Sequence, residues 1–310
     1  MSYGLFSGIL WGIDTVVLGI ALAMVPFADA AEASLASAFL HDFSCAAILF
    51  AYMAARGRLG DTLAALKTKS GKAVMLGALL GGPLGMSGYL IAINNIGAGY
   101  TAAISAFYPA VGAFLAFMIL KEKMSPKQMI ALLVALLGVV AMGWSSMGDA
   151  TSGNPLVGIL GALLCVFGWG SEAVILAWGM QDDAVDNETA LQIRETTSAL
   201  VYGIIVMPLT RSLGFVGEAF ITPANGVILL AALAGTISYL FYYKAIDTIG
   251  ASRGMALNIS YSAWAVVFGI FAGVVPGAFE IICCIVIIVG TVLSASPDWS
   301  ELGFKKRSTS

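Results

Sequence analysis

Long runs of apolar residues, separated by short polar connections, fill most of the chain. Ten of these runs have about the 20 residues that an α-helix needs to cross a hydrocarbon core of roughly 30 Å. Their spacing predicts an all-α polytopic membrane protein with ten transmembrane helices. The runs lie at about 3–25, 34–54, 73–93, 98–120, 127–147, 155–178, 189–210, 225–246, 251–272 and 277–296.

Lysine and arginine residues concentrate in alternate connections between the runs. The connection 55–72, the ends of the fourth and eighth runs and the C-terminal tail all lie on one side of the membrane if the N-terminus does. On the other side, Arg211 is the single basic residue in the connections. By the positive-inside rule, we expect both termini in the cytoplasm, and the protein in the bacterial cytoplasmic (inner) membrane.

Composition narrows the classes of function. Hydrophobic residues make up 59% of the chain and charged residues 11%, which fits a membrane protein and gives no indication of nucleic-acid binding. No glycine-rich loop ends in Lys-Ser or Lys-Thr, so we expect an ion gradient rather than ATP to supply energy. The four cysteines show neither metal nor disulfide spacing. We therefore predict free thiols, no metal and no cofactor.

The chain repeats itself in two halves. Trp11-Gly12-Ile13-Asp14 corresponds to Trp169-Gly170-Ser171-Glu172, in the first and sixth runs. Each half contains five runs. Because five is an odd number, the second half enters the membrane from the opposite side, as in an inverted repeat. We predict repeats over 1–150 and 151–297, and a cytoplasmic tail over 298–310. Further matches, 152 or 153 residues apart, join His41-Asp42 to Arg194-Glu195, Ile96-Gly97-Ala98 to Ile249-Gly250-Ala251, Tyr108 to Tyr261, and Gly138 to Gly290.

The end of the fourth run and the start of the fifth resemble a known family. Leu120-Lys121-Glu122-Lys123, then Ser125-Pro126-x-Gln128 and an apolar run with Gly138, look like the EamA branch of the drug/metabolite transporter superfamily. The resemblance implies a secondary transporter that works by alternating access. The second half departs from it, because the position that matches Glu122 is Val274. The Trp-Gly-x-acid and His-Asp segments are also similar to those of bacterial choline-uptake members.

Buried acids are the first candidates for a functional site. Asp14 and Glu172 lie deep in their runs, where a carboxylate costs about 2.5–3.5 kcal/mol on insertion scales. Neither has a basic residue within one helical turn, so both are predicted to bind a cation and to exchange protons. His41, Asp42 and Glu195 are predicted to take part in proton coupling. Because a basic residue precedes each of these last two acids, a charge-balanced structural network is the alternative.

Aromatic residues are the second candidates. Tyrosine in the middle of a membrane needs a partner for its hydroxyl group, which favours an interior position. Aromatic faces also hold quaternary ammonium groups by cation–π attraction, worth about 2 kcal/mol or more when desolvated. Ordinary packing is the alternative for each of them. The predicted substrate-binding aromatics are Trp11, Tyr89, Tyr108, Trp169, Tyr239, Tyr242, Tyr261 and Trp264.

Together these features predict a proton-coupled secondary transporter for a small organic cation, with choline or another quaternary ammonium compound as the best candidate. Its partners would be the substrate, protons and the lipid bilayer, and the protein would be a monomer or a homodimer. Export of amino acids or aromatic metabolites is an alternative. A non-transporting receptor or a membrane enzyme belongs to another class. We predict no enzymatic activity, because one histidine and scattered cysteines offer no nucleophile with its base.

The charge distribution generates a topology prediction. A reporter fused to the C-terminus and a tag inserted within 60–68 should both be cytoplasmic, because the basic connections stay on that side. Protease protection and reporter activity in whole cells measure this. Exposure of either label outside the cell would contradict the ten-helix inverted repeat.

Overall fold

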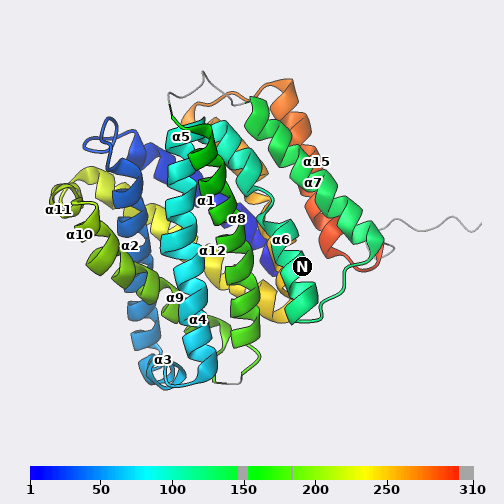
Figure 1. The fold of residues 1–310 in the computed structure, drawn as a ribbon, viewed down its shortest axis with the longest axis horizontal. Helices are drawn as coiled ribbons and strands as arrows, with labels where there is room; N and C mark the ends of the chain where they lie inside the picture. The colour runs from blue at the N-terminus through cyan, green and yellow to red at the C-terminus, as the bar shows by residue number, and fades with distance from the viewer. Residues whose placement is uncertain (146–152, 183, 300–310) are drawn as a thin grey trace, which may run out of the picture.

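The computed structural model describes residues 1–145, 153–182 and 184–299, and within these ranges every regular element is a helix (Figure 1). The all-α prediction is therefore confirmed. The predicted boundary between 150 and 151 and most of the predicted tail lie outside the described residues. The α-helices are α1 (Ser2–Leu22), α2 (Ala33–Ala55), α3 (Leu59–Ala65), α4 (Lys69–Leu79), α5 (Met86–Ser105), α6 (Tyr108–Ile119), α7 (Pro126–Ser145), α8 (Pro155–Gly179), α9 (Asn187–Val201), α10 (Met207–Leu209), α11 (Leu213–Phe220), α12 (Pro223–Ile249), α13 (Ala251–Asn258), α14 (Tyr261–Gly269) and α15 (Ala278–Ala295).

In the described part of the chain, nine helical segments are long and apolar enough to span a membrane. They correspond to nine of the ten predicted runs. The remaining run, 189–210, is also helical, with a π-helical segment (Tyr202–Val206) between α9 and α10. Charged residues lower its hydropathy, and most of α9 is buried against α2, α4 and α12 rather than facing outward. This run is therefore an interior helix of the bundle.

Equivalent helices of the two halves make equivalent contacts. α1 packs along α12, the third span of the second half, and α8 packs along α5, part of the third span of the first half. α2 contacts α9, and α7 pairs with α15 at one side of the bundle (Figure 1). This exchange of partners is what an inverted repeat with a pseudo-two-fold axis produces. The predicted arrangement of two inverted five-helix repeats is confirmed.

The glycines of the two Trp-Gly-x-acid stretches allow this close packing. A Cβ on Gly12 would lie 2.6 Å from the Cβ of Trp264 in α14, and one on Gly170 would lie 2.9 Å from the carbonyl oxygen of Tyr108 in α6. Small residues let membrane helices approach closely when the hydrophobic effect cannot drive their association. The repeated glycine therefore sets the same helix contact in each half.

A second pair of matched glycines shapes the backbone. Gly97 has φ 82° and ψ 163°, and Gly250 has φ 90° and ψ 160°. Positive φ values of this kind favour glycine, which lacks a Cβ. After each glycine follows a short helical stretch, then a turn, and then a new helix that begins at Tyr108 or Tyr261. In both halves the span is therefore broken, and the matched tyrosine is the first residue of the helix that follows the break.

Glu122, at the charged end of the fourth span, caps a helix of the second half. Its carboxylate accepts hydrogen bonds from the backbone N–H groups of Ala251 at 2.8 Å and Ser252 at 2.9 Å, at the N-terminus of α13. An acid at this place satisfies unpaired N–H groups and complements the helix dipole. Val274, the matched residue of the second half, has no group that could do so.

This cap generates a stability prediction. Replacing Glu122 with Gln removes the charge and one of the two acceptors, so it should destabilise the protein by about 1 kcal/mol, as the loss of other helix caps does. Thermal unfolding in detergent measures the change. Glu218→Gln makes the same chemical change at an exposed position and should leave the melting temperature unaltered. Equal melting temperatures for both variants would show that the cap contributes nothing.

Candidate functional site

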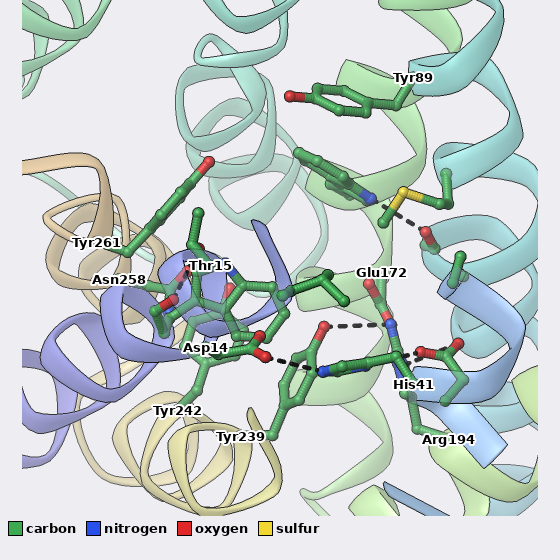
Figure 2. Close-up of a pocket in the computed structure, with 18 of the residues that line it drawn as sticks. Asp14, Thr15, His41, Tyr89, Glu172, Arg194, Tyr239, Tyr242, Asn258 and Tyr261 are labelled. Carbon is green, nitrogen blue, oxygen red and sulfur yellow. Dashed lines mark hydrogen bonds and ion pairs between the residues drawn. The ribbon is translucent and has the colours of Figure 1, made fainter. Parts of the chain in front are cut away.

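A cavity of about 380 Å³ lies between the two halves and contains nine of the ten residues predicted to bind substrate (Figure 2). It extends from Trp11 in the middle of α1 toward Leu22, Ser34 and Ile93. The predicted residues that line it are Trp11, Asp14, Tyr89, Tyr108, Trp169, Glu172, Tyr239, Tyr242 and Tyr261, joined by His41 and Asp42 of the proton-coupling set.

Two predicted residues do not line the cavity. Trp264 packs behind α1, where its Cβ faces Gly12, and its ring lies 6.3 Å from that of Phe268. Glu195 is fully buried behind Arg194. Helical spacing from Tyr261 suggested that Trp264 would share its face. The turn at which α14 begins sets the rotation of this helix, and helical spacing alone does not predict that rotation.

The first half contributes an acid–base–acid cluster. Nε2 of His41 lies 3.0 Å from Oδ1 of Asp14, which joins α2 to α1, and Nδ1 of His41 lies 3.6 Å from Oδ1 of Asp42. The Ser198 hydroxyl donates a hydrogen bond of 2.5 Å to Asp42. The Asp14 and His41 side chains are only 4% and 8% exposed. The charges of this cluster are therefore poorly screened by water.

The second half contributes the matching cluster around Arg194. Its Nε donates a hydrogen bond of 2.9 Å to Glu172, and its Nη1 lies 3.0 Å from Glu195. The guanidinium also lies 4.9 Å above the ring centre of Tyr239, and Nη1 is 3.7 Å from Asp42. Sequence reasoning did not place Arg194 in the site. Its match with His41 in the repeat was the available signal.

The absence of a basic residue near Asp14 and Glu172 in sequence was therefore misleading. Each acid has a basic partner on the next transmembrane helix of its own half, at positions 41 and 194. Helical spacing reports neighbours within one helix, whereas these partners meet only when neighbouring helices pack side by side. The pairing reduces the local charge but does not remove it.

Taken together, the polar centre contains more acids than bases. With all four carboxylates ionised, the formal charge of its six groups is −3 with neutral His41 and −2 with protonated His41. Buried charge without compensation is unfavourable, so the excess of acids calls for protons or a bound cation. The six groups are Asp14, His41, Asp42, Glu172, Arg194 and Glu195.

Trp169 forms the aromatic wall of the first side of the cavity. Its ring stacks on Tyr89 at 5.5 Å between ring centres and meets Tyr108 edge-on at 5.7 Å. The indole N–H donates a hydrogen bond of 3.1 Å to the carbonyl oxygen of Gly81. Packing and this hydrogen bond together fix the orientation of the ring.

Trp11 forms the corresponding wall of the second side. It meets Tyr239 edge-on at 4.7 Å and Tyr261 at 6.3 Å. The two walls use matched residues, because Trp11 corresponds to Trp169 and Tyr261 to Tyr108. A ligand in the cavity would thus contact aromatic side chains from both repeats.

A hydrogen-bonded chain leads away from the cavity. The Tyr108 hydroxyl donates to Oδ1 of Asn258 at 3.1 Å, and the Asn258 amide donates to the Ser7 hydroxyl at 2.8 Å. Ser238 in turn donates to the backbone oxygen of Ser7 at 2.8 Å. These bonds tie α6, α13, α1 and α12 together next to the site. Nothing in the sequence pattern indicated Asn258.

Comparisons with known proteins agree with this architecture. Residues 1–144 match the EamA-like transporter family. Protein LicB of Haemophilus influenzae is 31% identical over 195 residues, which are 63% of this chain and 64% of the length of LicB. A solved crystal structure with 17% sequence identity superposes with a TM-score of 0.70 over 94% of each chain, which shows a shared fold. Over residues 1–144, the chain is thus similar to the EamA-like transporter family.

Proposed function

We propose that the protein is a secondary active transporter for a small organic cation, with choline or another quaternary ammonium compound as the best candidate, and that protons drive it. One observation carries this proposal. An aromatic cavity with the volume of an ordinary ligand site contains more buried carboxylates than basic groups. A quaternary ammonium group would supply the missing positive charge without needing hydrogen bonds, while the aromatic faces add cation–π attraction.

The alternating-access mechanism is part of the same proposal. With both termini in the cytoplasm, the cavity extends toward the outer ends of its helices, at Leu22 and Ser34. The cavity lies between two packed repeats, so rocking of one repeat against the other could expose it to either side in turn. The structure then corresponds to a state in which the site is closest to the outside of the cell.

An ion-pair network supports closure on the inner side. Arg58, which follows α2, pairs with Asp186 at 2.8 Å and also with Glu188, at the start of α9. Arg56 contributes a second ion pair to Glu188 at 2.6 Å, and the Tyr52 hydroxyl donates to the same carboxylate at 2.8 Å. The network joins the two halves where their helices would have to separate for inward opening.

Two partners of this network, Arg58 and Asp186, keep their charges over the physiological range. Hydrogen bonds to Asp61 and Asp186 hold the pKa of Arg58 above its usual value. Burial alone would raise the pKa of Asp186, but hydrogen bonds from Thr189 and the Arg58 guanidinium outweigh it, so the pKa is lowered. A pH change near neutrality therefore leaves the Arg58–Asp186 pair ionised.

A second candidate function has its own observation. Arg194 lines the cavity and carries a positive charge beside Tyr239. It could receive the carboxylate of an amino acid whose ring packs among the aromatic residues. Export of aromatic amino acids or related metabolites thus fits the same cavity. It requires a negatively charged group on the ligand, whereas the first candidate requires a positively charged one.

Ligand charge separates these candidates. Choline should bind to the purified protein, whereas its neutral carbon analogue 3,3-dimethylbutan-1-ol should compete at least tenfold more weakly, because a desolvated cation–π contact alone is worth about 2 kcal/mol. Competition against labelled choline at a fixed pH measures this. Equal competition by the neutral analogue would contradict a cation site, and strong competition by phenylalanine would favour the second candidate.

The acid nearest to Arg194 provides the matching protein variant. Glu172→Gln keeps the size of the side chain but removes one negative charge, so choline affinity should fall by about tenfold to a hundredfold, the range for a lost charged partner of about 1.5–3 kcal/mol. Isothermal titration calorimetry in detergent measures the affinity. Glu218→Gln is the control and should bind as the parent does. Parental affinity in Glu172→Gln would assign that carboxylate to a structural network.

A further inference from the structure

The two repeats contain the same cluster with one chemical difference. In the first half His41 lies between Asp14 and Asp42, and in the second half Arg194 lies between Glu172 and Glu195. Figure 2 shows His41 beside Asp14 and Arg194 beside Glu172. The first acid of each half lies 3.0 Å or 2.9 Å from its base, and the second lies 3.6 Å from His41 or 3.0 Å from Arg194. The repeat thus places the two bases beside matched acids.

These two bases behave differently toward protons. An imidazole gains and loses a proton near neutral pH, whereas a guanidinium in a protein stays charged. With both glutamates ionised, the second cluster has a formal charge of −1, and its base cannot change that charge. The first has −2 with neutral His41 and −1 with protonated His41. Protonation of His41 makes the charges of the two halves equal, and its loss leaves an extra negative charge beside the cavity.

On this basis, and resting on the proposed cation transport, we propose that His41 is the proton switch of the transporter. The Asp14–His41–Asp42 cluster would exchange the coupled proton, whereas the Arg194 cluster would keep its charge and position the substrate. When the cation binds, the imidazolium of His41 releases one proton and becomes neutral imidazole. When His41 is protonated again, the cation is expelled.

The surroundings of His41 support this assignment. Every helix packed against it presents a defined set of groups: Asp14 from α1, Asp42 and Cys45 from its own helix, and Arg194 with Glu195 from α9. From α12 it is faced by Gly235, where an added Cβ would lie 3.0 Å from Nε2 of His41, and Tyr239 of the same helix contacts Arg194. The ring is therefore held in place between two carboxylates, and a cation bound in the cavity would compete with its proton for them.

Two substitutions at position 41 test the proposal through opposite effects. His41→Gln imitates the neutral ring, so its choline affinity should equal that of the parent at high pH and should not change with pH. His41→Arg imitates the protonated ring and the second repeat, so its affinity should be at least tenfold weaker and equally insensitive to pH. The parent should bind choline at least about tenfold more tightly at about pH 8.5 than at about pH 5.5. This is the effect expected of one nearby charge.

Calorimetry in two buffers with different ionisation enthalpies adds a second readout. The parent should release up to about one proton for each choline bound near neutral pH, and His41→Gln should release none. Because Gly235 leaves little space around position 41, folding of each variant is checked by thermal unfolding. If only His41→Gln folds, its proton count and pH profile are sufficient for the test.

The outcomes separate this inference from the proposed function. Choline binding that is lost equally in both variants, or a parental pH profile in His41→Gln, would show that His41 is structural and that protons are exchanged elsewhere. Choline affinity that falls as the pH rises would overturn the competition between proton and cation. Failure of the parent to bind choline at any pH would instead contradict the proposed function itself.

Discussion

The ion pairing of Arg194 is the interaction on which the centre of this bundle depends. The guanidinium connects α9 to Glu172 on α8 and to Tyr239 on α12, and lies within 3.7 Å of Asp42 on α2. Removing one partner from a buried ion pair costs about 3–5 kcal/mol, because the other charge is left without compensation. The arginine thus supplies a positive charge to acidic groups in the middle of an apolar bundle and ties the walls of the cavity together.

Close helix packing provides the framework for this centre. Glycines at equivalent places bring α1 onto α14 and α8 onto α6, and another pair, Gly138 and Gly290, brings α7 onto α15. Apolar helices gain nothing from the hydrophobic effect when they associate in lipid. Close packing at small residues therefore supplies most of the attraction between them. The cavity lies where the two repeats meet, and this is where relative movement of the repeats would change access.

The symmetry of the repeat is most informative where it fails. The scaffold gives each half a tryptophan, an acid, a base and a second acid in similar positions. Within that scaffold, histidine is replaced by arginine, and Glu122 by Val274. The first exchange decides which of the two bases can lose its charge. The second decides which broken helix has its N-terminus capped by a carboxylate.

The sequence by itself determined the helical class, nine of the spans and the inverted repeat, because hydrophobic length, basic connections and matched motifs are local properties of the chain. It also indicated most of the cavity-lining residues, since deep acids and aromatic residues in a membrane have few alternatives to an interior position. Only the tertiary structure decided which groups pair. Asp14 meets His41, and Glu172 meets Arg194, across helix interfaces whose rotation no periodicity specifies. The same reason explains Trp264, which shares a helical face with Tyr261 in sequence but packs behind α1 in the folded protein.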